Sequence, residues 1–520
     1  NYISNLQFPI LHNSFLYFSM LMQQLAQDKQ DRTSEAIAWA AANGFMVRAN
    51  RDPTLFDHAP FTLYPTPYPA KLYKRAQSLS VPFNLLVDRV ARDDAWLRAT
   101  LQEAAAADPF VADQLKVYER VMEEGIAQQT YLGIHRSDYM IHVPRTNNVQ
   151  DEGETKKEPN ILQVELNTIA ASFGCLSTKV SQMHRYLRTK AQLRNMTVDA
   201  DELPVNDATA GLASAINSAH QQYKMQRACT TEPCVLFVVQ DGETNTVDQR
   251  LFEFELTTKH GVAVLRRSLT SLSDSKCAAL SKTNNENGKK GLNILMVEGH
   301  EISVVYYRAG YTPRDYPSNA EWAARLLVER SYAIKCPSIA YQLVGAKKVQ
   351  QQLANSGELE RFLSAEEGCA EARSTFAGLW QVDDASVAMV MEKNGVGYVM
   401  KPQREGGGNN IYNEEISKEL KNMTKEERSA FIFMELIQPP EIQGTMVRSG
   451  KSGEGQGTLS ELGIYSSFLG NGDSVYHSNY IGHLLRTKPL DATEGGVASG
   501  YSVLDSPRLV KEFVPEMCSA

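Results

Sequence analysis

Apolar positions along the chain fall into two kinds of spacing. Leu86, Val90, Leu97 and Leu101 recur at helical intervals on a stretch that also carries Asp and Arg residues, and this spacing predicts an amphipathic helical region. Further on, CVLFVVQ (234–240) is a short, continuous apolar run, as expected for a strand that is buried on both faces. Helical and strand-like segments alternate in this way along the chain, which favours a fold of mixed helices and sheets.

More elements follow that first buried strand. Residues 245–259 predict a helix and residues 261–267 a second strand, which complete a βαβ unit. Residues 292–308 predict two further strands, joined at Gly299 and His300. Because a βαβ unit needs both faces of its sheet covered, this region predicts a layered α/β arrangement.

The next helix has a clear start and stop. Ser318 and Glu321 have the spacing of a capping box, and the helix that they begin stops before Pro337. We therefore expect a compact α/β domain inserted within a larger one. The predicted division is an N-terminal extension at 1–23, the N-terminal part of the core at 24–231, the inserted domain at 232–345, and the C-terminal core with its lid at 346–520.

Less regular segments lie at the N-terminal end and between these elements. Residues 7–23 are fairly apolar, but Pro9 and several polar residues interrupt them and no basic flank precedes them. A membrane span needs about 20 mostly apolar residues and a signal peptide needs a charged start, so we expect an extension and no membrane association. Residues 144–159, 282–291 and 449–457 predict loops or insertions, of which the last two cap hairpins or form lids.

Charge and cysteine content narrow the class of protein. The 520 residues carry 53 Lys and Arg against 61 Asp and Glu, a net charge of −8. This argues against a generic nucleic-acid-binding protein, which has a basic excess, although a local basic cluster can still bind anionic substrates. The seven cysteines are scattered and odd in number, which argues against a disulfide scaffold and favours the reducing cytosol.

The sequence KPQREGGGNN (401–410) is the strongest local signal, and it follows a predicted strand end at 398–400. Lys401 brings positive charge, Glu405 adds a carboxylate, and the glycine run at 406–408 lets the backbone approach a ligand closely. Such a set suits a phosphate with its magnesium ion. Taken by itself, the segment is more readily explained as a surface turn.

A second signal is QVELNT (163–168). Strand alternation places Glu165 and Asn167 on one face, and two oxygen ligands at this spacing can hold one hard cation. The alternative is a pair of solvent-facing polar residues on an edge strand. Arg136 and Arg308 lie near aromatic residues, as in carboxylate-binding sites, although surface salt bridges are the alternative for each.

These segments belong to a longer series of matching strings. The strings are FNLLVDRV (83–90), GIAQ (125–128), RSDYM (136–140), ELNTIAASFG (165–174), DQR (248–250), RLLVERSYAIKCP (325–337), KKVQQ (347–351), KPQREGGGNN (401–410), SELGIY (460–465) and GHLLRTK (482–488). In this order they resemble the eukaryotic glutathione synthetase family, over roughly residues 24–510.

The resemblance implies an α/β (α+β) ATP-grasp fold, in which the nucleotide lies between two lobes. It implies an ATP-dependent ligase that joins glycine to γ-glutamylcysteine through an acyl phosphate, with Mg²⁺ as cofactor, in a cytoplasmic homodimer. Magnesium and cationic side chains offset the repulsion between the peptide carboxylate and the γ-phosphate. A lid keeps water from the acyl phosphate. No protein nucleophile is needed.

The resemblance also implies a role for individual residues. The implied magnesium ligands are Glu165, Asn167 and Glu405. The implied ATP contacts are Lys347, Lys401, Gly406, Gly407, Gly408, Asn410, Tyr412, Met434, Glu435, Ile437, Glu461, Lys488 and Glu494. The implied peptide contacts are Arg136, Ser172, Glu243, Asn245, Gln249, Arg308, Tyr311, Arg486, Val497 and Ala498. Arg136, Lys347, Lys401 and Arg486 are expected to act directly in catalysis.

Two rival functions stay open at this point. One is a sister ligase that takes β-alanine or serine as the amine, because acceptor choice depends on the shape of the lid loop around 492–500. The other is a binding protein that kept the fold and lost the chemistry. The second would have lost a metal ligand or lysine, whereas Glu165, Asn167, Lys347 and Lys401 are all present.

Overall fold

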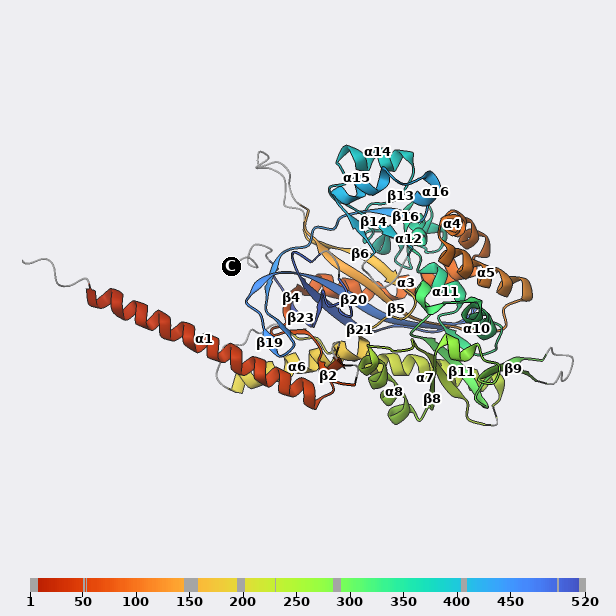
Figure 1. Ribbon diagram of the computed structural model, residues 1–520, viewed down its shortest axis with the longest axis horizontal. Helices are drawn as coiled ribbons and strands as arrows, with labels where there is room; N and C mark the ends of the chain where they lie inside the picture. The colour runs from red at the N-terminus through yellow and green to blue at the C-terminus, as the bar shows by residue number, and fades with distance from the viewer. Residues whose placement is uncertain are drawn as a thin grey trace, which may run out of the picture.

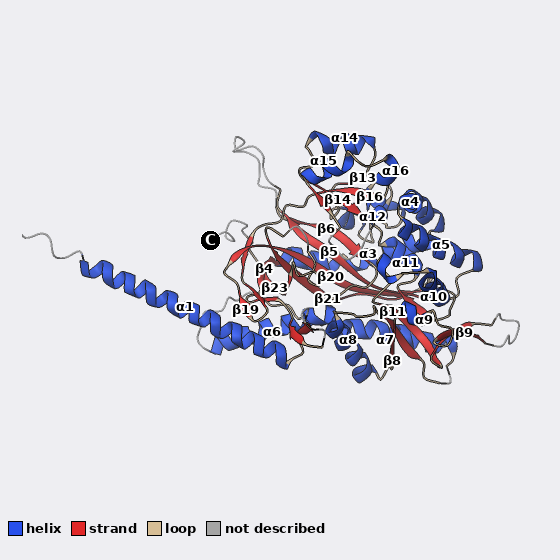
Figure 2. Cartoon of the chain, in the orientation of Figure 1, coloured by secondary structure: helices blue, strands red, loops and turns tan. Residues whose placement is uncertain are grey.

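The described residues form three larger sheets, two small two-stranded sheets and the helices around them, and Figures 1 and 2 show their arrangement. The structure is a computed structural model, and it describes residues 8–49, 52, 54–144, 158–193, 202–229, 231–283, 291–403, 409–492 and 495–513. Most of the predicted insertions at 144–159 and 282–291 therefore lie outside the described residues. Among the described residues, no helix combines the length and the apolar character that crossing a membrane requires.

The largest sheet has nine strands among the described residues, in the order β19-β18-β3-β22-β21-β20-β5-β6, with β17 paired to β20. The strands are β3 (Phe61–Thr62), β5 (Tyr131–His142), β6 (Asn160–Asn167), β17 (Ile442–Gly444), β18 (Met446–Arg448), β19 (Lys451–Ser452), β20 (Gln456–Gly470), β21 (Val475–Pro489) and β22 (Val503–Asp505). The QVELNT segment is thus an edge strand, as the sequence suggested. The turn between β18 and β19 lies at Ser449 and Gly450, within the predicted loop.

A second sheet occupies the region around the predicted βαβ unit. Its strands, six among the described residues, are β7 (Cys234–Val238), β8 (Val264–Arg267), β9 (Ala278–Lys282), β10 (Asn293–Val297), β11 (His300–Tyr307) and β12 (Ile334–Cys336). Strands β8, β7, β11 and β12 run parallel, which confirms the βαβ prediction. The β10–β11 turn is at Glu298 and Gly299, both with positive φ, so His300 already belongs to β11. The sequence therefore placed the turn between these two strands one residue too late.

A third sheet lies beside the free edge of β6. Its strands are β13 (Leu379–Gln381), β14 (Tyr398–Pro402), β15 (Ile411–Tyr412) and β16 (Phe431–Glu435), in the order β13-β16-β14-β15. Side chains of β14 and β16 share an apolar cluster with Leu162 and Val164 of β6. This cluster joins the third sheet to the largest one (Figure 1). Two small sheets pair β1 (Met46–Arg48) with β2 (Phe56–His58) and β4 (Thr66–Pro69) with β23 (Pro507–Val510).

Helices pack on both sides of the sheets (Figure 2). They are α1 (Phe8–Ala42), α2 (Ala70–Ser78), α3 (Ser80–Arg92), α4 (Asp94–Ala107), α5 (Pro109–Glu124), α6 (Gly174–Leu193), α7 (Ala208–Arg227), α8 (Thr246–His260), α9 (Leu269–Leu272), α10 (Asn319–Glu329), α11 (Ile339–Val344), α12 (Lys347–Ala354), α13 (Cys369–Arg373), α14 (Asp384–Glu392), α15 (Glu414–Leu420) and α16 (Lys425–Arg428), with 3₁₀ turns η1 (Pro313–Asp315) and η2 (Leu359–Arg361). Helix α1 runs without a break across the expected boundary at 23/24, and Figure 1 shows it projecting from the body.

Local capping explains where two of these helices begin. The predicted helical stretch from Leu86 to Leu101 is two helices, because Asp93 leaves helical geometry and its carboxylate accepts a hydrogen bond from Trp96 N at the start of α4. At α10 the expected capping box is present, with Ser318 N donating to the Glu321 carboxylate at 3.0 Å. Such caps stabilise a helix start by about 1 kcal/mol.

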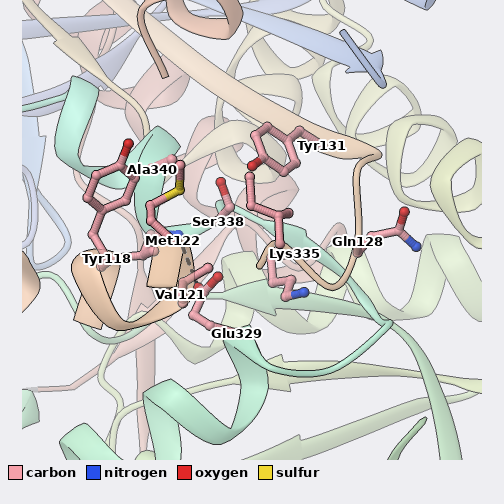
Figure 3. Close-up of a pocket in the computed structure, with 11 residues that line it drawn as sticks. Tyr118, Val121, Met122, Gln128, Tyr131, Glu329, Lys335, Ser338 and Ala340 are labelled. Atoms are coloured by element: carbon pink, nitrogen blue, oxygen red, sulfur yellow. Dashed lines mark hydrogen bonds between the residues drawn. The ribbon is translucent and has the colours of Figure 1, made fainter. Parts of the chain in front are cut away.

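A group of buried charges, which we call the helix cluster, lies at the end of α10. It consists of Arg325, Glu329 and Lys335, each no more than 5 % exposed. Arg325 Nε donates to Glu329 at 3.0 Å and its guanidinium stacks 4.2 Å from the ring centroid of Tyr307. Lys335 Nζ donates to Ser331 O at 2.7 Å. Glu329 and Lys335 line a small cavity of about 20 Å³, room for about one water molecule, and Figure 3 shows them among the residues that line it.

Candidate functional site

A buried arginine–aspartate pair lies on β5, the strand next to the β6 edge of the largest sheet. On β5, Arg136 donates to both carboxylate oxygens of Asp138, from Nε at 2.7 Å and from Nη2 at 2.8 Å. Burial opposes the charge of Arg136, but Asp138 raises the pKa of the guanidinium well above its ordinary value. Sequence reasoning selected Arg136 and missed Asp138, although alternation along a strand places positions 136 and 138 on one face.

Two predicted phosphate-binding lysines meet at the neighbouring edge strand β6. Lys347, the first residue of α12, donates from Nζ to Glu165 Oε2 at 2.8 Å. Lys401, on β14, donates to Val164 O at 3.0 Å. Burial alone would raise the pKa of Glu165, but Lys347, Lys401 and Arg136 hold that pKa well below its ordinary value. The carboxylate is therefore ionised and surrounded by positive charge.

A second ion pair completes the arrangement from strands β20 and β21. Arg486 donates through Nη2 to Glu461, which is opposite it in the β20–β21 register, and to Asp138 Oδ2 at 3.1 Å. Burial raises the pKa of Glu461, Arg486 lowers it, and the carboxylates of Asp138 and Glu165 raise it further. We call the set Arg136, Asp138, Glu165, Lys347, Lys401, Glu461 and Arg486 the site cluster. Its four cations exceed its three carboxylates among the described residues.

The segment after β6 connects the site cluster to a further arginine. Arg308, directly after β11, donates from Nη1 to Ala170 O at 2.6 Å and from Nη2 to Ser172 Oγ at 2.7 Å. Arg136 Nη1 reaches Ser172 O at 3.4 Å. Two predicted peptide-binding arginines thus meet at one residue. The backbone here is strained, since Ala170 and Phe173 have φ of 51° and 70°.

Three more predicted peptide contacts lie at the start of α8, beyond the carboxyl end of β7. Glu243 accepts hydrogen bonds from Asn245 N at 2.7 Å and from Gln249 Nε2 at 2.6 Å. The side-chain amide of Asn245 is buried, yet neither its nitrogen nor its oxygen has a hydrogen-bond partner among the described residues. An unpaired buried amide is costly, and a polar ligand would satisfy it.

An open cleft of about 790 Å³ lies at the carboxyl ends of the parallel strands. Tyr311, Ser268 and Gln240 line it, and Asn409 borders it from the end of the glycine-rich segment. Ligands of parallel α/β sheets bind at this end of the strands. The cleft therefore connects the peptide-binding candidates with the segment expected to bind phosphate.

The predicted adenine contacts surround the apolar cluster between β6 and the third sheet. Met434 and Ile437 are buried in it, and Tyr412 packs against it. Asn410 Nδ2 donates to the Tyr412 hydroxyl at 3.2 Å. Glu435 is exposed at the end of β16, and Lys488 lies two residues after Arg486 on β21.

Other predicted site residues are placed differently or lie beyond the described part of the chain. Glu405, Gly406, Gly407, Gly408 and Glu494 lie outside the described residues. Val497 is buried in an apolar core cluster, whereas the neighbouring Ala498 is exposed. Among the described residues, no group of three or more His, Cys, Asp or Glu side chains could hold a metal ion. The proposed ligand set thus depends on Glu165 and Asn167 together with Glu405.

Comparison with known proteins shows the family of the chain. The family model described as "Eukaryotic glutathione synthase, ATP binding domain" matches residues 26–509. The chain belongs to the eukaryotic glutathione synthase family. It is accordingly an ATP-dependent ligase of glutathione biosynthesis.

Relatives in distant organisms match over nearly their whole length. Glutathione synthetase of Dictyostelium discoideum is 40% identical over 92% of this chain and 98% of that protein. The human glutathione synthetase is 38% identical over 93% of this chain and 98% of its own length. The solved structure of a glutathione synthetase-like effector from Globodera pallida has a TM-score of 0.71 at 22% identity, covering 93% of this chain and 97% of that one. The fold class expected for the family, mixed α/β of the ATP-grasp type, is confirmed.

Proposed function

We propose that this enzyme joins glycine to γ-glutamylcysteine with Mg²⁺ and ATP, and releases glutathione, ADP and phosphate. The observation that carries the proposal is the site cluster. It brings two lysines expected at the ATP phosphates into contact with β6, which carries Glu165 and pairs with β5, the strand of Arg136. Two anions, a peptide carboxylate and a γ-phosphate, approach each other most easily at such an excess of buried positive charge.

The chemistry assigns a task to each part of the cluster. Arg136 binds the cysteinyl carboxylate, whose oxygen attacks the γ-phosphorus of ATP while the bond to ADP breaks. Lys347 and Lys401 stabilise the negative charge on the transferred phosphoryl group. The glycine amine then attacks the acyl carbon, and phosphate leaves as the amide bond forms. Arg308, Glu243 and the unpaired amide of Asn245 hold the rest of the peptide.

The residues present fit a magnesium ion. Glu165 is an ionised oxygen ligand, and Asn167 lies two residues further along the same strand. Mg²⁺ prefers carboxylate and amide oxygens, so Glu165 and Asn167, with Glu405, would hold it. When bound, it would supply positive charge at the phosphate oxygens.

A coupled assay of ADP release tests the function directly. We expect ADP to form with ATP, Mg²⁺, γ-glutamylcysteine and glycine, and mass spectrometry to detect one glutathione for each ADP. Leaving out glycine should abolish glutathione formation. Replacing glycine with β-alanine or serine tests the sister-ligase alternative, which faster turnover with either amine would support. No ADP release with any of the three amines would refute the proposal.

Three further properties belong to the same proposal. We propose the domain division 1–23, 24–231, 232–345 and 346–520, a homodimer, and a cytoplasmic location. The mixed sheet made of β7 to β12 lies within the third of these ranges, which supports the division. Light scattering coupled to gel filtration would measure the dimer as a mass of twice 57.9 kDa. Imaging the tagged full-length protein in its own cell would test the location.

A further inference from the structure

The carboxylate of Asp138 lies where three of the proposed binding groups meet. Asp138 is fully buried. Its Oδ1 accepts from Arg136 Nε at 2.7 Å, and its Oδ2 accepts from Arg136 Nη2, Asn167 Nδ2 and Arg486 Nη2 at 2.8, 3.0 and 3.1 Å. The Asp138 side chain thus contacts two residues proposed to bind the peptide, Arg136 and Arg486, and one proposed to bind the metal ion, Asn167.

The contacts of Asn167 determine how its amide is oriented. Its Nδ2 donates to Asp138 Oδ2 at 3.0 Å and to Arg136 O at 3.2 Å. Both partners are acceptors only, so the nitrogen of the amide must face them. The amide oxygen therefore faces the opposite way, and within the described part of the chain it accepts no hydrogen bond. Asp138 leaves that oxygen available to a cation.

The same carboxylate holds Arg136 in one geometry. A bidentate pair fixes the plane of a guanidinium, because both hydrogen bonds must be made at once. The remaining nitrogen, Nη1, reaches Ser172 O at 3.4 Å, on the side of the second predicted peptide arginine. Asp138 itself is too enclosed by these partners to touch a substrate.

The partner strand makes room for this pair. Gly463 of β20 lies opposite Asp138 in the strand register. A Cβ atom at Gly463 would lie 2.7 Å from Asp138 Oδ1 and 2.9 Å from Arg136 Cδ, closer than real Cβ atoms approach. Because Gly463 has no side chain, the Arg136–Asp138 pair can lie against β20.

We infer that Asp138 is a positioning residue that orients both the peptide-binding Arg136 and the metal-binding amide of Asn167. The identity of the peptide rests on the proposed function, whereas the orientation of Asn167 does not. Removing the charge of Asp138 should therefore weaken two binding events together. A residue with only a structural role would lower the stability of the fold and leave both affinities unchanged.

The test uses Asp138→Asn and a matched control. Asp505→Asn removes another fully buried carboxylate from the same sheet, whose partners are the hydroxyls of Thr62, Thr66 and Thr487. Electron paramagnetic resonance measures Mn²⁺ affinity with a non-hydrolysable ATP analogue present. Calorimetry measures γ-glutamylcysteine affinity under the same conditions. We expect D138N to weaken each affinity at least tenfold, and D505N to change each less than twofold.

A double variant separates the two effects. In D138N/N167D the amide is at position 138 and the carboxylate at position 167, so donor and acceptor are exchanged. The hydrogen bond between the two positions can therefore form again, and the second carboxylate oxygen at position 167 remains for the cation. We expect Mn²⁺ affinity to return to within threefold of wild type, while peptide affinity stays at least fivefold weaker because Arg136 still lacks its carboxylate.

The outcomes distinguish this inference from the proposed function. Folded D138N with both affinities within twofold of wild type would overturn the inference. A double variant that binds Mn²⁺ as weakly as D138N would also overturn it. If D138N does not fold, the inference is overturned by a double variant that binds the peptide as tightly as wild type. If wild-type protein neither binds γ-glutamylcysteine nor releases ADP, the proposed function fails, while the Mn²⁺ measurements still test the role of Asp138.

Discussion

The site cluster and the helix cluster both bury charge, but they stabilise it differently. In the site cluster, side chains from β5, β6, β14, β20, β21 and α12 neutralise one another, and the pKa of Glu165 is lowered despite its burial. In the helix cluster, Lys335 donates to a backbone carbonyl, and burial lowers its pKa to about 8. Glu165 thus stays ionised beside Lys347, whereas the ionised form of Lys335 is disfavoured by its burial.

This contrast indicates what each cluster does. The site cluster assembles four cations around a strand edge, and its net charge is unbalanced until anionic ligands arrive. The helix cluster leaves little room for a ligand, since its cavity holds about one water molecule and Arg325 contacts an acid, an amide and an aromatic ring. Changes in the first should alter activity, and changes in the second should alter stability.

The largest effect is expected from Glu165→Gln. The change removes the ionised carboxylate that Lys347 contacts and that we propose as a magnesium ligand. Loss of one charged group from a phosphoryl-transfer site costs about 10³-fold in kcat, roughly 4 kcal/mol of barrier. ADP release measures it, and a thermal melt shows whether the fold is intact. Glu158→Gln, at an exposed carboxylate just before the same strand, is the control, and wild-type turnover in E165Q would refute the metal assignment.

Arg325→Met should show the opposite behaviour. It leaves Glu329 buried without its guanidinium, which we expect to lower the free energy of unfolding by about 3 kcal/mol. Urea denaturation measures this loss, while kcat per folded molecule should stay within twofold of wild type. Arg330→Met removes a half-exposed arginine from the end of the same helix and should cost about 1 kcal/mol or less. Equal losses in both variants would mean that the helix cluster is no more than a surface ion pair.

Gly463→Ala tests how closely the site cluster is packed. The added methyl group meets the Arg136–Asp138 pair, so we expect about a tenfold rise in the KM for γ-glutamylcysteine, with about 1–2 kcal/mol of overpacking. Gly455→Ala, where nothing lies within 4 Å of the new Cβ, should leave KM unchanged. An unchanged KM in G463A would show that the pair can shift without affecting peptide binding.

Local features of the fold were predictable from the sequence, and long-range ones were not. The buried run at Cys234–Val238 and the capping box at Ser318 depend on neighbouring residues only, and both predictions are confirmed. The break at Asp93 was missed because the apolar spacing continues through it. Asp138 was missed for a different reason, since its importance comes from Arg486, which is 348 positions away in the sequence and reaches it only through the β5-β20-β21 pairing.

The smallest effect is expected in the pH dependence of stability at Lys335. Burial lowers its pKa from 10.5 to about 8 in the folded state, so between those values the unfolded chain binds more protons than the folded one. Stability therefore rises with pH in this window. The side chain of the Lys335→Met variant does not titrate. Relative to this variant, we expect the free energy of unfolding of wild type to rise by about 1 kcal/mol from pH 7.5 to pH 9. Urea denaturation at the two pH values measures the gain, and Lys425→Met, at an exposed lysine, should show none. A constant difference between wild type and K335M would mean that Lys335 keeps its full charge within the fold.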